Sequence, residues 1–239
     1  FKNNPYFIVH PYFTNYFCGV NTTAKIKKFI ILGILFLLPI TAYLFFSSGI
    51  NHFAKLPVLT QNVLEINQFK TEKGTSKLLK DHITILCFFG NNLEATKANA
   101  FNLAHKIYKK NYQFKNFQFV ILTPDGSQSQ VKSLKEELSE IENAVNWNFV
   151  YSSPNEIEKV FNSLGSNYSL DANMASPYVF IIDKDRSLRG RDDDDDVGLL
   201  YGFDSSDYSE VNNKMSDDVR VILAEYRLAL KKYNSKREI

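Results

Sequence analysis

The sequence is poor in cysteine and lacks several motifs that mark enzymes. Its two cysteines, Cys18 and Cys87, are too few for a disulfide framework or a zinc cluster. It contains no Gly-x-Ser-x-Gly elbow, and no glycine-rich loop follows a predicted strand, so a serine hydrolase and a dinucleotide site have no support. The 28 basic and 26 acidic residues nearly balance, and we therefore expect no broad surface for nucleic acid.

One long uncharged run, from Phe29 to Phe46, dominates the first part of the chain. Extended to Ile50, this run would form a helix of ~30 Å, enough to cross the hydrocarbon core of a bilayer. A cleaved signal peptide usually has a shorter apolar region, of about 7–15 residues, before small residues that "SSG" matches poorly. We therefore predict an uncleaved transmembrane anchor over residues 29–50, with Pro39 tolerated inside it.

The charges that flank this run predict its orientation. Lys25, Lys27 and Lys28 precede the run directly, and the positive-inside rule then keeps the amino terminus in the cytoplasm. The predicted organisation is a disordered cytoplasmic segment over 1–28, the anchor over 29–50 and an extracytoplasmic domain over 56–239.

Strand-like and helix-like segments alternate along the outer domain. "HITILCFF", "FQFVIL" and "SPYVFIID" are apolar runs of strand length, typical of strands buried on both faces of a sheet. Apolar residues at helical spacing follow Gly90 and recur from Val131 to Val145. This alternation predicts an α/β domain with a mostly parallel central sheet flanked by helices.

Capping residues mark two helix starts. Ser153 is a predicted cap, with Pro154 in the first helical position and Glu156 three residues after the cap, and Gly165 is placed to end that helix. The final helix is predicted to begin at Ser216, where acidic residues suit the positive end of the helix dipole.

Two short signatures, together with the anchor and the order of elements, resemble the Sco/SenC family. "CFFGNN" resembles that family's strand ending in Phe-Gly, and "VFIIDKDRSLRG" resembles its late strand and reversing hairpin. The resemblance covers residues 56–233, and TlpA-like and peroxiredoxin-like proteins share both signatures. It implies a membrane-tethered thioredoxin-like fold, associated in that family with copper delivery to cytochrome c oxidase. It also implies an inner-membrane protein whose carboxyl-terminal domain faces the periplasm.

The resemblance locates the positions at which the family binds copper. The family uses two cysteines, spaced Cys-x-x-x-Cys beyond the Phe-Gly, and a histidine shortly before the late strand. When the chain is aligned on the two signatures, these positions fall on Glu94, Ala98 and Ala175. Soft thiolates select Cu(I), and a thiolate is also the nucleophile of disulfide exchange. We therefore expect neither chemistry here and no cofactor.

Other side chains could substitute for the missing ligands. Cys87 is either a displaced redox thiol or, as we favour, a small core residue, because an apolar strand raises the pKa of a thiol. Met174 offers only a lone thioether, a weak ligand, while His82 and His105 are expected to be surface or satisfied histidines. Pro177 precedes an apolar strand where the thioredoxin fold usually carries a cis-proline, so it is a candidate for a cis peptide bond.

Five consecutive acidic residues are the most unusual surface feature of the sequence. They are Asp192, Asp193, Asp194, Asp195 and Asp196. A run of like charges is usually a solvated loop, although clustered carboxylates also suit Ca²⁺ and other hard cations. The spacing of a calcium-binding loop is missing, and the acidic surface could equally meet a basic partner.

Three functions remain open at this point. The leading hypothesis is a non-catalytic accessory or scaffold in respiratory oxidase assembly, or in envelope redox or copper homeostasis. Its expected partners are the membrane and another protein, such as an oxidase assembly component. The alternatives are a thiol oxidoreductase that uses Cys87 and a hard-cation-binding protein that uses Asp192 to Asp196.

Overall fold

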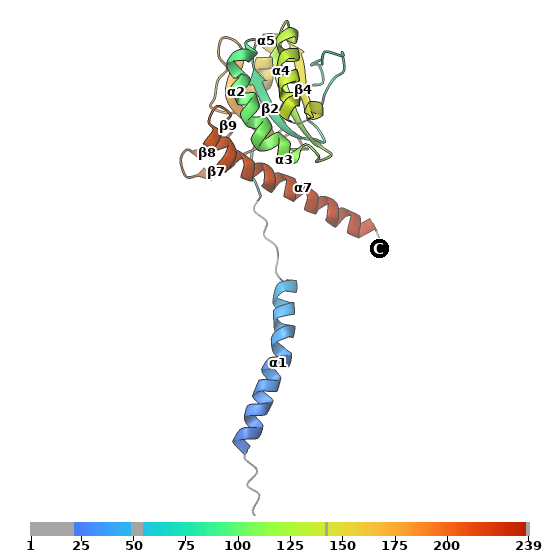
Figure 1. The fold of residues 1–239 in the computed structure, drawn as a ribbon, viewed down its shortest axis with the longest axis vertical. Coiled ribbons are helices and arrows are strands. Elements are labelled where there is room, and N and C mark those ends of the chain that lie inside the picture. Colours follow the sequence, from blue (N-terminus) through green and yellow to red (C-terminus); the bar gives the residue numbers. More distant parts are fainter. Residues whose placement is uncertain (1–21, 49–54, 142, 238–239) are drawn as a thin grey trace, which may run out of the picture. The chain divides into compact units, whose positions relative to one another are not determined.

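The computed structural model describes residues 22–48, 55–141 and 143–237. The chain divides into two units, Phe1–His52 and Phe53–Ile239, and Figure 1 labels several of their elements. In the first unit, helix α1 spans Thr22–Ser48. The helix thus begins inside the segment expected to be disordered, because the Ala and Lys residues before the apolar run are good helix formers. Residues 1–21 of that segment, and the last two of the predicted anchor, lie outside the described residues.

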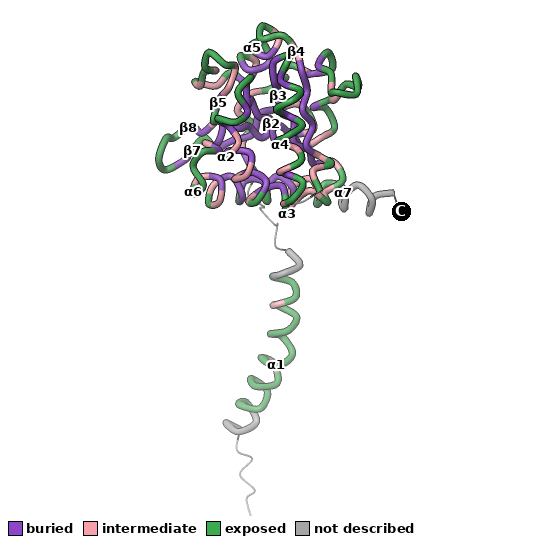
Figure 2. The backbone as a smooth tube through the Cα atoms, turned by 45° about the horizontal axis from the view of Figure 1, so that its top comes forward, coloured by how far each residue is buried: buried purple, intermediate pink, exposed green. Residues whose placement is uncertain are grey.

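Helix α1 has the length and composition of a membrane-spanning segment. Its apolar window covers the 20 residues Ile26–Phe45 and includes Pro39. The large apolar side chains in this window are exposed, as the green tube of α1 in Figure 2 shows. Such a helix near the amino terminus fits either a membrane anchor or a signal sequence.

The second unit is built on a sheet with the strand order β1–β6–β5–β2–β3–β4. The strands are β1 (Val58–Thr60), β2 (Ile83–Phe89), β3 (Phe117–Pro124), β4 (Trp147–Ser152), β5 (Ala175–Ile182) and β6 (Leu188–Arg189), and β9 (Phe203–Asp204) pairs with β5 off this path. Strands β2, β3 and β4 are parallel, whereas β5 runs antiparallel to β2 and β6 antiparallel to β5. The parallel strands β2 and β3 with the helices between them form a βαβ unit, and the antiparallel strands β5 and β6 lie on the other side of β2. This arrangement is a thioredoxin-like fold.

The sheet is mixed, so the expectation of a mostly parallel sheet was right only for β2, β3 and β4. The difference arises at β5, which starts beside the end of β2, since Ala175 pairs with Phe89. Residues 163–174 form no helix or strand, and they return the chain to that end of the sheet before β5 begins.

Helices cover both faces of the sheet. They are α2 (Leu93–Leu103), η1 (Ala104–Tyr108), α3 (Lys109–Asn111), α4 (Gln128–Ile141), η2 (Ala144–Asn146), α5 (Pro154–Asn162), α6 (Tyr208–Glu210), η3 (Val211–Met215) and α7 (Ser216–Arg237). Buried side chains of α2, α4 and α7 pack in one core layer, and those of α5 pack in the other. A separate hairpin joins β7 (Arg191–Asp194) to β8 (Gly198–Leu200).

All seven residues of β2 are buried, as the sequence predicted, and its side chains alternate between the two core layers. Ile85, Cys87 and Phe89 face the layer of α2 and α4, whereas Leu86 and Phe88 face the layer of α5. Figure 2 shows β2 and β3 as buried strands inside the unit. No side chain of β2 is therefore presented to solvent.

Helix boundaries agree with the sequence at one start and differ elsewhere. Ser153 caps α5 and accepts a hydrogen bond from the Glu156 N–H at 3.4 Å, as predicted. Helix α4 ends at Ile141, so Val145 lies in the separate turn η2, where it is 72% exposed instead of buried. The last helix begins before Ser216, at α6, where Asp207 is the cap, and the π-helical turn η3 connects it to α7.

A buried guanidinium joins three separate parts of the second unit. Arg189 donates from Nε to the Leu56 carbonyl at 2.7 Å, and its other nitrogens bind Asp183 at 3.0 Å and Glu225 at 2.7 Å. The Arg189 and Asp183 side chains are only 6% and 4% exposed. Because Asp183 also accepts from the Ser187 N–H at 2.8 Å, its charge is compensated on both oxygens.

Replacement of Arg189 by methionine tests the importance of this network. The variant leaves the Asp183 carboxylate buried without a cation, and we expect it to lower the free energy of unfolding by about 3–5 kcal/mol. Trp147 is the chain's one tryptophan and is buried, so its fluorescence reports urea unfolding of this unit in the full chain in detergent micelles.

The matched control is Arg220→Met. Arg220 pairs with Asp217 on the surface, and its side chain is 69% exposed, so we expect a loss below about 1 kcal/mol. Equal losses in the two variants would show that the buried network does not contribute more than a surface pair.

Candidate functional site

The candidate site lies where β2 ends and the segment before β5 returns to it. Gly90 has φ +67°, and a Cβ added there would overlap the Asn173 carbonyl oxygen and lie 2.9 Å from the Ala175 Cβ. The Asn91 N–H also donates to the Asn173 carbonyl at 3.0 Å. Only glycine fits this approach of two backbones, so the Phe-Gly signature has a direct structural role.

The segment beside Gly90 is a turn held by its own hydrogen bonds. One carboxylate oxygen of Asp171 accepts from the N–H groups of Asn173 and Ala175, each at 2.8 Å. The Asp171 N–H donates to the Ala175 carbonyl at 2.9 Å, and the Met174 N–H donates to the Asp171 carbonyl at 3.0 Å. Met174 takes a left-handed conformation with φ +61°, so the turn fixes its backbone. The thioether of Met174 is a single soft metal ligand in this turn.

The other two predicted positions lie on the first turns of α2. Glu94 and Ala98 are both exposed, and the Glu94 side chain is 83% exposed. Residues four apart lie on one face of a helix, so the structure places this pair together. The nearest charged partner of Glu94 is Lys97, whose ammonium lies 3.8 Å away and pairs more closely with Glu137, at 2.7 Å.

Hydrogen bonds fix the loop that leads from the strand to α2. Gln130 of α4 accepts from the Leu93 N–H and donates to the Asn91 carbonyl, both at 3.0 Å. Ala175 lies beside the end of β2 and adds only a methyl group to the site. The residues present therefore do not fit Cu(I), because one solvated carboxylate and two methyl groups supply no soft ligand.

The structure corrects the candidate cis-proline. Among the described residues no peptide bond is cis, so the Ser176–Pro177 bond is trans. Pro177 lies inside β5, where the extended trans backbone lets its carbonyl accept hydrogen bonds from Ser205, at 2.9 Å from the N–H and 2.5 Å from the hydroxyl. Pairing with β9 therefore continues directly beyond the proline.

Cys87 is the only thiol among the described residues, and it is fully buried in β2. Burial raises the pKa of the Cys87 thiol, because the thiolate would lose its hydration in the apolar core. The two histidines of this region are also remote from the site. His82 precedes β2 at its opposite end and contacts the Lys80 carbonyl through Nδ1 at 2.9 Å, and His105 lies in η1.

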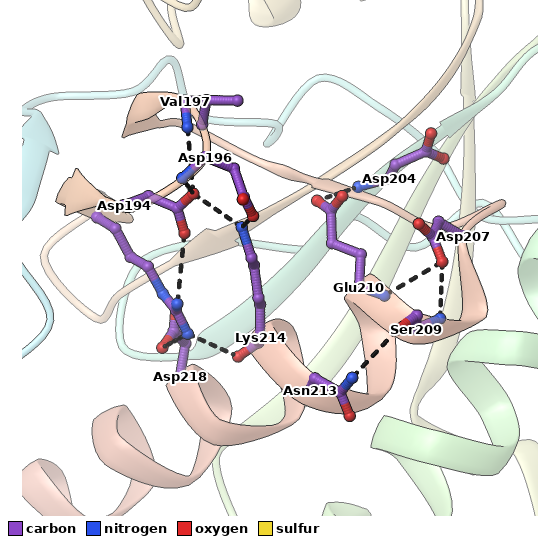
Figure 3. A network of polar contacts seen from close by, with 11 residues as sticks. Asp194, Asp196, Val197, Asp204, Asp207, Ser209, Glu210, Asn213, Lys214 and Asp218 are labelled. Carbon is purple, nitrogen blue, oxygen red and sulfur yellow. Dashed lines mark hydrogen bonds and ion pairs between the residues drawn. The ribbon is translucent and has the colours of Figure 1, made fainter.

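The aspartate run forms a hairpin whose central carboxylate is already bound by cations. Asp194 is buried, and its carboxylate contacts the ammonium of Lys214 at 2.8 Å (Figure 3). It also contacts the guanidinium of Arg191 at 3.4 Å. Lys214 also binds Asp196 at 2.5 Å, while Arg191 binds both oxygens of Asp218, at 2.8 and 2.9 Å. Although burial favours the neutral acid, the bonds from Lys214 and the backbone outweigh it and lower the pKa of Asp194.

The hairpin is therefore an ordered element with internal charge pairs, not a free loop of repelling charges. The other aspartates, Asp192, Asp193, Asp195 and Asp196, are exposed. Across residues 22–48, 55–141 and 143–237, no group of three or more His, Cys, Asp or Glu side chains is arranged to hold a metal ion.

Sequence reasoning missed the basic partners of this hairpin. Lys214 lies far along the chain from the aspartates, on the π-helical turn η3. One feature of the sequence could have pointed to Lys214 as a partner of the aspartates. It is the only basic residue between Val197 and Ser216, a segment rich in acids and amides.

Thiol labelling tests whether Cys87 can react. In a Cys18→Ser background, we expect iodoacetamide to leave Cys87 unmodified in the folded chain from about pH 7 to about pH 9, and to modify it fully in urea. Burial keeps the reagent away from the sulfur, and the raised pKa keeps the thiolate a minor species, so modification should remain negligible at every pH in this range. Mass spectrometry of the full chain measures the modification.

The matched control adds Ala98→Cys to the same background. That thiol lies on the exposed face of α2, and it should react in the folded state at a rate that rises with pH. Labelling of Cys87 at the rate of the control would contradict the burial of the native thiol.

No protein-family model and no curated protein matches the chain. Among solved structures, a SCO1/SenC family lipoprotein from Bacillus anthracis is similar over 74% of this chain and 99% of its own, with 17% identity and a TM-score of 0.46. A peroxiredoxin-like protein from Aquifex aeolicus is similar over 70% and 87%, with 16% identity and a TM-score of 0.41. The thioredoxin domain of a thiol-disulfide oxidoreductase from Bacteroides vulgatus is similar over 56% and 85%, with 16% identity and a TM-score of 0.39. The thioredoxin-like fold of this chain follows from its own strand order.

Proposed function

We propose that this chain is a membrane-anchored protein of the Sco/SenC type that keeps the fold without the copper and thiol groups. One observation carries the proposal: the three positions of the missing ligands hold an exposed carboxylate and two methyl groups, while Cys87 is sealed inside β2. A domain without these groups acts by binding other molecules. Its role is therefore that of an accessory or scaffold in the assembly of a respiratory oxidase.

The proposed location is the inner membrane, with the second unit in the periplasm. The support is the length of the apolar window of α1, which suits an anchor that remains attached. Lys27 and Lys28 lie at the amino-terminal end of that helix, where the positive-inside rule expects the cytoplasmic side.

The two alternative functions find no geometric support. A thiol oxidoreductase needs an accessible thiolate, whereas Cys87 is buried and its pKa is raised by that burial. On the aspartate run, no group of three or more acidic side chains among the described residues is arranged to hold a cation, and Lys214 and Arg191 already contact the oxygens of Asp194.

Gene deletion in the source cell tests the accessory role. We expect membranes without this chain to lose cytochrome c oxidase activity, because assembly would lack one of its binding partners. The full chain should restore the activity, and a Cys87→Ala chain should restore it equally, since the thiol takes no part. Oxidase activity and the amount of each chain are measured in the same membranes.

Two results would contradict this role. Unchanged oxidase activity after deletion would remove the link to the oxidase. A Cys87→Ala chain that accumulates to the normal level but restores nothing would show that the thiol carries the function.

A further inference from the structure

The last helix of the chain extends beyond the domain against which it packs. Among the side chains that the structure describes, the last buried one of α7 is that of Leu223. The consecutive residues Arg227, Leu228 and Ala229 are all exposed. Successive residues of a helix point in directions about 100° apart, so the domain covers no side of the helix at these three positions. Residues 227–237 therefore form about three helical turns that leave the second unit, as Figure 1 shows.

The sequence of these turns is basic and amphipathic, and we call residues 227–237 the basic extension. The segment contains five basic residues and no acidic one. The basic residues are Arg227, Lys231, Lys232, Lys236 and Arg237. Tyr226, Leu230 and Tyr233 recur at i, i+4 and i+7, which is the register of one helix face. This pattern is typical of a helix that lies in the interface of a membrane.

Basic residues near the carboxyl end of a helix also suit the helix dipole. That effect falls off within the last turn, whereas Arg227 lies more than two turns before the end of α7. The dipole also gives no reason for an apolar face that extends beyond the domain. Helices gain most of their stability from the packing of one face, so the basic extension fits a surface that is both anionic and partly apolar.

The basic extension starts beside the point at which the chain enters the second unit. The Arg189 guanidinium binds the Leu56 carbonyl and the Glu225 carboxylate, each at 2.7 Å. Only residues 49–54 lie between the end of α1 and Lys55, and a chain of this length spans at most about 25 Å. With α1 as the anchor of the proposed function, the chain therefore tethers the start of the basic extension near the bilayer.

The acidic hairpin of β7 and β8 lies at the other end of α7. Asp218 pairs with Arg191 of that hairpin, at 2.8 Å. Arg227 is nine residues further along the helix, a distance of about 14 Å. Interactions between exposed charges are largely screened beyond about 10 Å at 0.1 M salt. The aspartates therefore oppose binding of the basic extension to an anionic surface only weakly.

We propose that the basic extension of α7 binds the surface of an anionic lipid bilayer. The helix face of Tyr226, Leu230 and Tyr233 lies toward the acyl chains, and the basic residues lie against the lipid phosphates. This inference rests on the proposed anchor and adds a second contact with the same bilayer. Two contacts restrict the orientations of the second unit, and with them the directions from which a partner protein can approach it.

Hydrogen exchange, measured by mass spectrometry, tests this binding on the full chain in two kinds of lipid nanodisc. One kind contains phosphatidylcholine alone, and the other contains phosphatidylcholine mixed with phosphatidylglycerol. We expect the amides of residues 227–237 to exchange about ten-fold more slowly in the anionic discs, because several basic residues then contact anionic lipid. Added salt should reduce this difference.

A triple variant removes charge from the basic extension. In Lys231→Gln, Lys232→Gln, Lys236→Gln, the difference in exchange between the two kinds of disc should fall below about two-fold.

The matched control is the triple variant Lys70→Gln, Lys73→Gln, Lys132→Gln. These three lysines are exposed, and none belongs to α7. The control removes the same charge and should keep the difference of about ten-fold.

Labels on two faces of the helix give a readout that holds even if a lysine variant fails to fold. Leu228→Cys and Leu230→Cys are made separately in the Cys18→Ser background and labelled with the fluorophore NBD. The two positions point about 160° apart around the helix. In the anionic discs, spin-labelled lipid should quench the label at position 230 more strongly than the label at position 228.

Several results would overturn the proposal. One is equal exchange of residues 227–237 in both kinds of disc by a chain that stays in the bilayer, which would leave the anchor intact. Others are equal effects of the two triple variants and equal quenching of the two labels. Protection that appears in detergent micelles and grows with protein concentration would show that a second copy covers the helix. A chain that leaves the discs would overturn the anchor, and this inference with it.

Discussion

Strand β2 contacts a layer of packed side chains on each of its faces, and the other elements of the second unit are arranged around it. Parallel β3 lies on one side of it and antiparallel β5 on the other, while α2, α4 and α7 cover one face and α5 covers the opposite one. A strand buried in this way can offer chemistry only at its ends. The thiol of Cys87, in its interior, is therefore part of the core, and the end at Gly90 is the place where function could arise.

At that end two backbone segments lie close together, and the side chains around them include no thiol. Gly90 lets the segment at Asn173 approach the strand, and Asp171 holds that segment in a tight turn. Glu94 and Ala98 share one face of α2, but neither is a soft ligand. Two charged clusters elsewhere, around Asp194 and around Arg189, are paired internally. The proposed accessory role is based on this lack of soft ligands at the end of β2.

Local patterns predicted the parts of this fold that depend on neighbouring residues. The buried run of β2 and the cap at Ser153 are such features, and both are confirmed. The sequence could not predict the π-helical turns, because η3 breaks the 3.6-residue period and hides the helix start before Ser216. Nor could it predict contacts between distant segments, such as Lys214 with Asp194, or the direction of β5.

Anaerobic Cu(I) titration of the full chain against a competing chelator tests the central claim most directly. Cys18→Ser removes the remote thiol, and a second chain adds Glu94→Cys, Ala98→Cys and Ala175→His to that background. We expect the first chain not to compete for Cu(I), and the second to bind one ion tightly, because two cysteines four residues apart on α2 lie about 5–6 Å from each other. Tight binding by the first chain would contradict the account, because Cys87 or Met174 would then belong to a working copper site.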